Sequence, residues 1–173
     1  MAGSTQILAA YRKTFPIRSP DLSRMRFEDE LRQISLTEGL QSLTSAPNQA
    51  AKIGVAPTKA RESEDTKYLW VIAAEDVPLA LERNNTAKLQ RGYLSHTNLT
   101  GGADAHSGGE LWFTDASVLI LNGGSGRYPP RSEAELEQAA LAFKAMGYKV
   151  ANMGWDSETN TPARYLRGDP KWI

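Results

Sequence analysis

From residue 68 onward, the apolar residues of the chain stand in short runs separated by turn-forming residues. The runs cover residues 68–72, 79–82, 93–97, 109–113 and 118–121. Short apolar runs bounded by Gly, Pro, Asn and Asp are typical of β-strands and too brief for most helices. Four residues separate the last two runs, which fits an antiparallel hairpin. The chain is therefore expected to build its core around a mainly antiparallel sheet.

One helix is predicted after these runs, from residue 133 to residue 146. Ser132 and Glu135 have the spacing of a capping box, and Gly147 stands where a C-terminal cap is expected. The apolar stripe of this helix consists of Leu136, Ala140 and Phe143. Residues 148–150 then begin a final strand, so the helix is expected to pack against the sheet.

The first 66 residues have a different pattern. Residues 1–43 are predicted to be helical, because Pro20 and Asp21 form a favourable helix start and apolar residues then recur mostly at helical spacing. Residues 44–66 are rich in small and charged residues, which is typical of a linker or a long surface loop. The sequence thus predicts an α+β fold: a helical N-terminal part, a linker or loop, and a domain at 67–173 of mainly antiparallel sheet with one packed helix.

The composition narrows the chemistry that this chain can perform. It has no cysteine and two histidines, which argues against disulfides, thiolate or histidine-rich metal sites, and cysteine nucleophiles. Lys and Arg together number 20, as do Asp and Glu, so nucleic acid and acidic lipid are disfavoured as partners. No apolar run has the length of a membrane span, and the N-terminus lacks a secretory signal pattern. We therefore expect a soluble, metal-independent protein that is cytoplasmic, or exported without a cleavable signal peptide.

The polar residues that call for a chemical explanation lie between residues 95 and 131. Glycine-rich stretches at 101–102, 108–109 and 123–126 interrupt the expected sheet. Glycine lets the backbone approach a ligand closely, so these stretches either line one cleft or form ordinary hairpin turns. None has the lysine of a phosphate-binding P-loop, and none opens a helix with dinucleotide-binding spacing.

Several side chains near these glycines are candidate site residues. His96 is either an acid or base near neutral pH or a structural residue bonded to backbone, whereas His106 is expected to be exposed in a loop. Glu110 precedes bulky apolar residues, so burial is expected to raise its pKa. Arg127 can hold a phosphate or carboxylate, and Tyr128 can stack on a ring or donate its hydroxyl. The alternatives for this last pair are a surface salt bridge and a packed aromatic side chain.

Three motifs occur together within residues 67–150. They are His-Thr-Asn-Leu at 96–99 with Gly-Gly at 101–102, Gly-Glu at 109–110, and Ser-Gly-Arg-Tyr-Pro-Pro at 125–130. This combination resembles a poorly characterised domain family with a His-Ser/Thr strand, a Gly-Glu strand, and a Ser-Gly-His-Tyr-x-Pro turn before a helix. The family occurs in the C-terminal domains of bacterial polymorphic toxins and secreted effectors, and a similar pattern appears in plant IQ-motif calmodulin-binding proteins. Arg127 stands where the family usually has histidine.

The resemblance implies a toxin- or effector-type domain, with a protein target or an immunity or chaperone protein as partner. The first function that we expect is ADP-ribosyl transfer from NAD, or NAD cleavage. Compact toxins of this class hold NAD with a histidine and a stacking tyrosine, while a later glutamate stabilises the oxocarbenium cation. His96, Tyr128 and Glu158 occur in this order, with Glu110 as a competing carboxylate. The expected substrate-binding residues are Thr97, Asn98, Gly102, Ser125, Gly126 and Arg127. NAD would be a substrate, and no cofactor or metal would be required.

Two other functions stay open at this point. In metal-independent RNA cleavage, Glu110 would act as base, His96 as acid and Arg127 as the phosphate ligand. The balanced net charge disfavours RNA, although Arg127, Arg131, Arg164 and Arg167 could form a local basic patch. In a non-enzymatic binding module, the glycine loops would present Trp70, Trp112 or Tyr128 to a protein partner.

Overall fold

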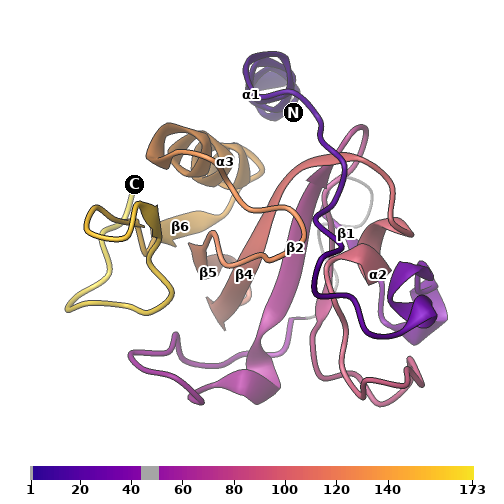
Figure 1. The fold of residues 1–173 in the computed structure, drawn as a ribbon. Coiled ribbons are helices and arrows are strands. Elements are labelled where there is room, and N and C mark those ends of the chain that lie inside the picture. Colours follow the sequence, from indigo (N-terminus) through magenta and orange to yellow (C-terminus); the bar gives the residue numbers. More distant parts are fainter. Residues whose placement is uncertain (1, 44–50) are drawn as a thin grey trace.

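The computed structural model describes residues 2–43 and 51–173, and its centre is a six-stranded sheet (Figure 1). The strand order is β1-β3-β2-β4-β5-β6. The strands are β1 (Gln41–Ser42), β2 (Tyr68–Ala73), β3 (Pro78–Leu81), β4 (Ala105–Asp115), β5 (Val118–Asn122) and β6 (Lys149–Asn152). Neighbouring strands pair antiparallel, except that β5 and β6 pair parallel. The expectation of a mainly antiparallel α+β fold is thereby confirmed.

Both faces of the sheet are covered, which explains why β2 reads as a continuous apolar run. Tyr68, Trp70 and Ile72 belong to a hydrophobic cluster beneath α1 (Ala2–Thr14) and α3 (Glu133–Ala145). Leu69 and Val71 belong to a second cluster, which includes Leu99 of the one-turn helix α2 (Thr97–Thr100). Figure 1 shows α1 and α3 on one side of the sheet and α2 on the other. Since successive side chains of a strand point to opposite faces, both faces require apolar residues.

Helix α3 agrees closely with its sequence signals. Ser132 is the N-cap, and its side chain accepts a hydrogen bond from the Glu135 amide at 3.1 Å. The Glu135 carboxylate accepts from the Arg131 amide at 3.0 Å, so only one half of the expected capping box is formed as the pattern implies. The stripe residues Leu136, Ala140 and Phe143 all lie in the core. Because α3 connects β5 to β6, these strands can pair parallel.

The prediction of a helical N-terminal part is wrong for most of its length. Helix α1 ends at Thr14, before the expected start at Pro20, and only the 3-10 helices η1 (Glu28–Leu31) and η2 (Leu36–Glu38) follow before β1. Residues 18–32, which we call the strap, bond to the rest of the fold instead. The Arg18 backbone pairs with Ala105 in both directions, and the Asn98 side chain donates to the carbonyls of Asp29 and Arg32. Long-range partners thus replace the bonds that a helix would supply.

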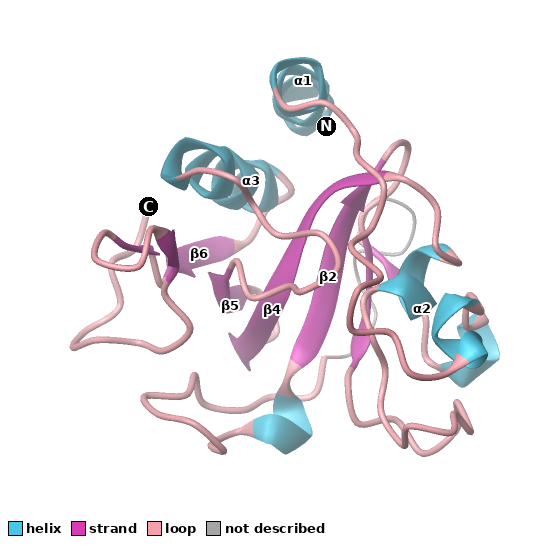
Figure 2. Ribbon diagram, in the orientation of Figure 1, coloured by secondary structure: helices cyan, strands magenta, loops and turns pink. Residues whose placement is uncertain are grey.

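The expected strand at 93–97 is also wrong. Its last residue, Thr97, is the first residue of α2, and His96 is the N-cap of that helix. The remaining short elements are η3 (Glu64–Thr66) and a hairpin of β7 (Trp155–Asp156) and β8 (Thr161–Pro162). Figure 2 shows how much of the chain between these elements is loop. Within residues 2–43 and 51–173, no helix has the length and apolar character that crossing a membrane requires.

The N-terminal residues share one core with the sheet. Leu8 and Tyr11 of α1, together with Leu43, are buried in the same cluster as the strands and α3. Of the linker or loop expected at 44–66, residues 44–50 lie outside the described residues. The part from residue 51 onward contacts the sheet: the Gly54 amide donates to the Phe113 carbonyl at 2.8 Å, and the Trp112 indole donates to the Ser63 carbonyl at 2.9 Å.

Candidate functional site

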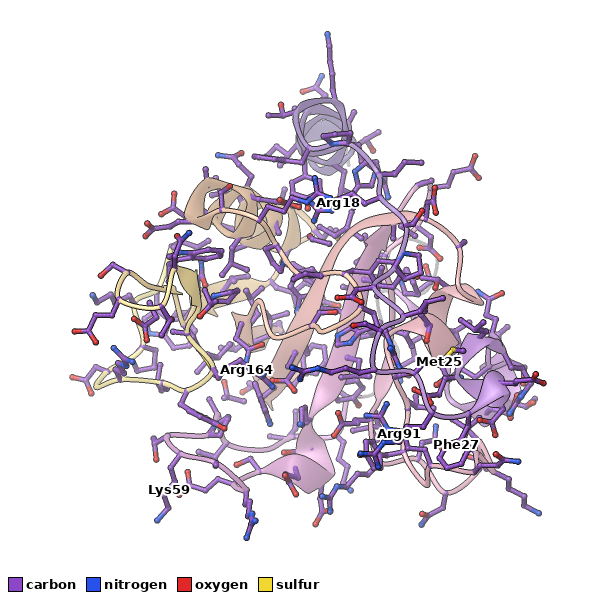
Figure 3. The ribbon with its side chains drawn as sticks, in the orientation of Figure 1. Arg18, Met25, Phe27, Lys59, Arg91 and Arg164 are labelled. Atoms are coloured by element: carbon purple, nitrogen blue, oxygen red, sulfur yellow. The ribbon has the colours of Figure 1, made fainter. Side chains whose placement is uncertain are left out.

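A pocket of about 950 Å³ opens beside the strap, at the edge of the second hydrophobic cluster. Four segments that are distant in the sequence supply its polar lining: the strap, residues 90–96, residue 110 of β4, and residues 124–129. Arg164, which follows β8, completes the wall. Figure 3 places Arg164 toward one side of the molecule and Arg91 with Phe27 toward the other. The volume falls at the upper end of the range for small-molecule sites, which is about 300–1,000 Å³.

Glu110 is the buried carboxylate of this pocket. One oxygen, Oε2, accepts from Lys67 Nζ at 3.0 Å, while Oε1 accepts from Asn122 Nδ2 at 3.0 Å and from Arg164 Nη2 at 3.1 Å. The sequence-based expectation of a raised pKa is wrong. Burial does oppose the charge, but the ion pairs with Lys67 and Arg164 outweigh it and lower the pKa of Glu110. The pocket therefore contains an ionised carboxylate near neutral pH.

Two glycines let the polar groups of the pocket come together. A Cβ at Gly124 would lie 2.4 Å from Arg164 Nε and 2.9 Å from Glu110 Oε1. A Cβ at Gly108 would lie 2.9 Å from the Trp70 carbonyl oxygen and 3.1 Å from His96 Cδ2. At Gly108 the added carbon would meet backbone at 2.9 Å, so the position needs glycine, whereas at Gly124 it would have to displace the Arg164 side chain. The glycine-rich stretch at 123–126 thus contributes to the pocket lining, and Gly108 lies directly behind two lining residues, His96 and Ser125.

His96 lines the pocket but is almost fully buried. Its Nε2 lies 2.8 Å from the Gly109 carbonyl oxygen. A carbonyl can only accept, so Nε2 carries the proton and Nδ1 of the neutral ring is left with its lone pair. Burial lowers the pKa of His96 to about 4, against the opposing effect of the Gly109 carbonyl. Near neutral pH this side chain can accept a hydrogen bond at Nδ1, but it has no second proton to donate.

Arginines dominate the charged lining. Arg24, Arg26, Arg91, Arg127 and Arg164 all face the pocket, together with the carboxylates of Asp21, Glu82 and Glu110. Among the described residues, no ion pair of Arg24 or Arg26 is found, whereas the other three arginines are paired. Arg91 and Arg127 share a single carboxylate, that of Glu30. The pocket therefore has an excess of positive charge in a chain whose net charge is zero.

Glu30 of the strap organises one side of this arrangement. Its carboxylate is buried, pairs with Arg127 and lies 3.1 Å from Arg91 Nη1. It also accepts from the backbone amides of Arg26 and Phe27, each at 2.8 Å. Burial opposes the charge of Glu30, but these amides and guanidinium groups prevail and lower its pKa. One carboxylate thus fixes two arginines and the strap backbone in a single orientation.

Half of the residues expected at the site lie together in the pocket. They are His96, Glu110, Ser125, Gly126 and Arg127. The expected surface salt bridge of Arg127 is instead a buried ion pair with Glu30. Ser125 Oγ accepts from the Tyr128 amide at 2.9 Å and shapes the turn that holds Arg127.

The other half lies outside the pocket lining. Tyr128 is buried in the second cluster, where its hydroxyl donates to the Ala103 carbonyl at 2.7 Å. Thr97 and Asn98 are fully buried, and Asn98 anchors the strap. Gly102 packs against Leu31 of η1 with a φ of +81°. Glu158 is exposed in the turn between β7 and β8.

Three further expectations about exposure are wrong. His106 is buried in β4, where its Nδ1 lies 2.5 Å from the Phe15 carbonyl oxygen and its ring packs against Tyr11. Trp70 and Trp112 are buried, so the glycine loops do not present them to a partner. In each case the residue belongs to a strand whose two faces are both covered. The amino-acid sequence of a single strand does not reveal this.

The sequence reasoning missed the pocket residues contributed by distant segments. Arg24 and Arg26 lie in the part that was expected to be helical, and neither they nor Arg91 and Tyr93 belong to a motif. The only available signal was the density of arginine around residues 24–32. The described residues contain no cluster of three or more side chains of His, Cys, Asp or Glu that could hold a metal ion.

Comparison with known proteins adds no assignment to this geometry. No protein-family model, no curated protein and no solved structure matches this chain.

Proposed function

We propose that the pocket binds a phosphate-bearing, nucleotide-like ligand, with NAD as the leading candidate and NAD cleavage or ADP-ribosyl transfer as the reaction. The observation that carries this proposal is that five arginines line a pocket that also contains an ionised, buried carboxylate, Glu110. Guanidinium groups are suited to phosphate oxygens, because they offer planar pairs of donors. Among the described residues Arg24 and Arg26 form no ion pair, although the Asp21 carboxylate acts on Arg24 from a longer distance, so a diphosphate can bind both guanidinium groups.

Glu110 has the character that NAD cleavage requires of its carboxylate. When the bond between the ribose anomeric carbon and nicotinamide breaks, its electron pair leaves with nicotinamide and the ribose gains positive charge. A nearby carboxylate stabilises that charge, and water or a nucleophile of a target protein then forms the new bond and loses a proton. Glu110 is ionised and lines the pocket, whereas Glu158 lies outside the lining. His96 Nδ1 is suited to accept a hydrogen bond from a ribose hydroxyl.

The same arginines favour a second candidate, RNA, because its phosphodiesters carry the same charge. The roles expected from the sequence would then have to change. His96 is neutral near pH 7, so it cannot act as the acid, and its pKa of about 4 makes it a weak base. Glu110 is paired with Lys67 and Arg164, which stabilise its ionised form and weaken it as a base. NAD fits this pairing better, since a fixed negative charge is what its reaction uses.

The test incubates the purified chain with NAD and with RNA in parallel, in excess chelator, and measures NAD binding by calorimetry. We expect NAD to bind and to be consumed. Raising the salt concentration should weaken binding because it screens the arginines. Glu110→Gln should abolish turnover while NAD still binds, and the matched Glu158→Gln variant should behave like the unmodified chain.

A glycine pair tests the pocket without changing any charge. Gly124→Ala should reduce NAD affinity about tenfold or more, because its methyl group would displace Arg164 from Glu110. Gly3→Ala, in α1 and outside the pocket lining, has open space around the added methyl group and should bind NAD as the unmodified chain does. RNA cleavage without NAD loss would replace the first function by the second. Absence of both activities and of NAD binding would leave a non-enzymatic binding module.

A further inference from the structure

Arg91 and Tyr93 form a stacked pair on the pocket wall. The Arg91 guanidinium carbon lies 4.2 Å from the centre of the Tyr93 ring, and both side chains face the pocket. Tyr93 is 42% exposed, whereas Tyr11, Tyr68 and Tyr128 are buried in the hydrophobic clusters. The ring of Tyr93 therefore has little role in the core, and its planar surface is available to a ligand in the pocket.

Glu30 holds this pair in place. The edge of the Arg91 guanidinium is bound to the buried Glu30 carboxylate, while 27% of the Arg91 side chain stays exposed. A guanidinium fixed by its edge and stacked on a tyrosine forms a rigid platform, since arginine stacks on flat π-systems through its plane. Phe27, labelled near Arg91 in the view of Figure 3, also lines the pocket. Because the platform is already ordered, little conformational entropy is lost when an aromatic ring stacks on it.

The platform and the unpaired arginines belong to one pocket but offer different chemistry. Arg24 and Arg26 are suited to phosphate oxygens, whereas Arg91 and Tyr93 are suited to a planar ring. A sugar phosphate or inorganic diphosphate would use only the first feature. A nucleotide carries a base and phosphate groups on one ribose and would use both.

We propose that Arg91 and Tyr93 form the stacking platform for the base of the ligand, so that the pocket selects nucleoside diphosphates over phosphates without a ring. This inference rests on the proposed function, because it assigns a further role within the same pocket. It replaces the stacking role expected for Tyr128, whose ring is buried and whose hydroxyl is bonded to the Ala103 carbonyl. Specificity for the ring thus comes from a segment that carries no sequence motif.

The experiment compares the binding of ADP with that of inorganic pyrophosphate by calorimetry. ADP is the half of NAD that carries adenine and the diphosphate, and pyrophosphate has the same charged groups without a ring. We expect ADP to bind more tightly than pyrophosphate. Tyr93→Leu should weaken ADP binding roughly 5- to 100-fold and leave pyrophosphate binding unchanged, since stacking contributes about this much per base. Tyr93→Phe keeps the ring and should retain most of the ADP affinity.

Tyr165→Leu is the matched control, because Tyr165 is 37% exposed and lies outside the pocket lining. It should leave both affinities unchanged, and thermal unfolding should show that all variants fold. Equal binding of ADP and pyrophosphate would overturn the platform while leaving phosphate binding in place. An equal loss of both ligands in Tyr93→Leu would overturn it too. If neither ligand binds the unmodified chain, the proposed function itself fails, and the platform with it.

Discussion

His96 is surrounded by groups that decide its protonation state. The Gly109 carbonyl accepts from its Nε2, and Glu110 favours a protonated ring. Arg164 and Lys67 disfavour that form, and burial disfavours it most. The balance keeps the imidazole neutral over the physiological range, which makes Nδ1 a permanent acceptor. A residue commonly used as a pH-sensitive group is thus converted into a fixed one.

This environment predicts a pH dependence of stability. In the unfolded chain His96 should titrate near its ordinary pKa of 6.5, whereas in the folded protein its pKa is about 4. Between these values the unfolded state binds more protons, so the free energy of unfolding should decrease as pH falls from 6.5 toward 4. The contribution is about 3 kcal/mol, fully present above pH 6.5.

Chemical denaturation of the unmodified chain and of His96→Gln at several pH values measures this effect. The glutamine amide can still donate to the Gly109 carbonyl but does not titrate. As pH falls from 6.5 to 4, the unfolding free energy of the unmodified chain should decrease relative to that of His96→Gln by the contribution of His96. His106 and the carboxylates are present in both and cancel. A difference that stays constant over this range would contradict the low pKa of His96.

At the scale of elements, those determined by their own residues were predicted correctly, and those determined by contacts far along the chain were not. Helix α3 was predicted because the cap at Ser132 and the apolar stripe lie within its own sequence. The strands β2, β3, β4 and β5 were predicted because each carries its own apolar run, whereas β1 was not predicted, since it lacks one. The strap could not be predicted, since its backbone bonds go to Ala105 and Asn98, far along the chain. The pocket was predicted in part for the same reason. The glycine-rich motifs indicated some of its residues, whereas most of its arginines belong to no motif.

The cap of α3 gives a prediction at this scale. Ser132→Ala removes the acceptor of the Glu135 amide, so the free energy of unfolding should fall by about 0.5–2 kcal/mol. Ser132→Asp keeps an acceptor at the N-cap and should lose little. Denaturant unfolding of the three proteins measures both effects. Equal stability of Ser132→Ala and the unmodified chain would mean that solvent or another group satisfies the Glu135 amide.

At the scale of the whole molecule, the two ends of the sequence build one core. Leu8 and Tyr11 of α1 pack in the cluster that α3 and the strands share. Arg18 pairs with Glu135 of α3 at 2.8 Å and also donates to the carbonyls of His106 and Pro129. These contacts cross the division that composition suggested near residue 66. Folding of residues 67–173 is thus coupled to the segment that precedes them.

Limited proteolysis tests this coupling. Trypsin should cut first within 44–66, where Lys59 and Arg61 are exposed. The two fragments should nevertheless elute together at the size of the intact chain, because Leu8, Tyr11 and Leu43 stay in the core. Residues 67–173 expressed alone should unfold at a lower temperature than the intact chain. A first cut within 110–150, or fragments that separate without denaturant, would contradict this arrangement.

The attachment of the strap separates the positions that maintain the fold from those that determine the ligand. Its ends are held through backbone groups, at Arg18 by Ala105 and at Asp29 and Arg32 by Asn98. Side chains between these anchors, including Arg24 and Arg26, face the pocket. Backbone anchors tolerate many side chains. The pocket-facing residues of the strap can therefore be substituted while the sheet stays the same. Descendants of one such chain could thereby acquire new ligands through a few substitutions in a single short segment, without rebuilding the core.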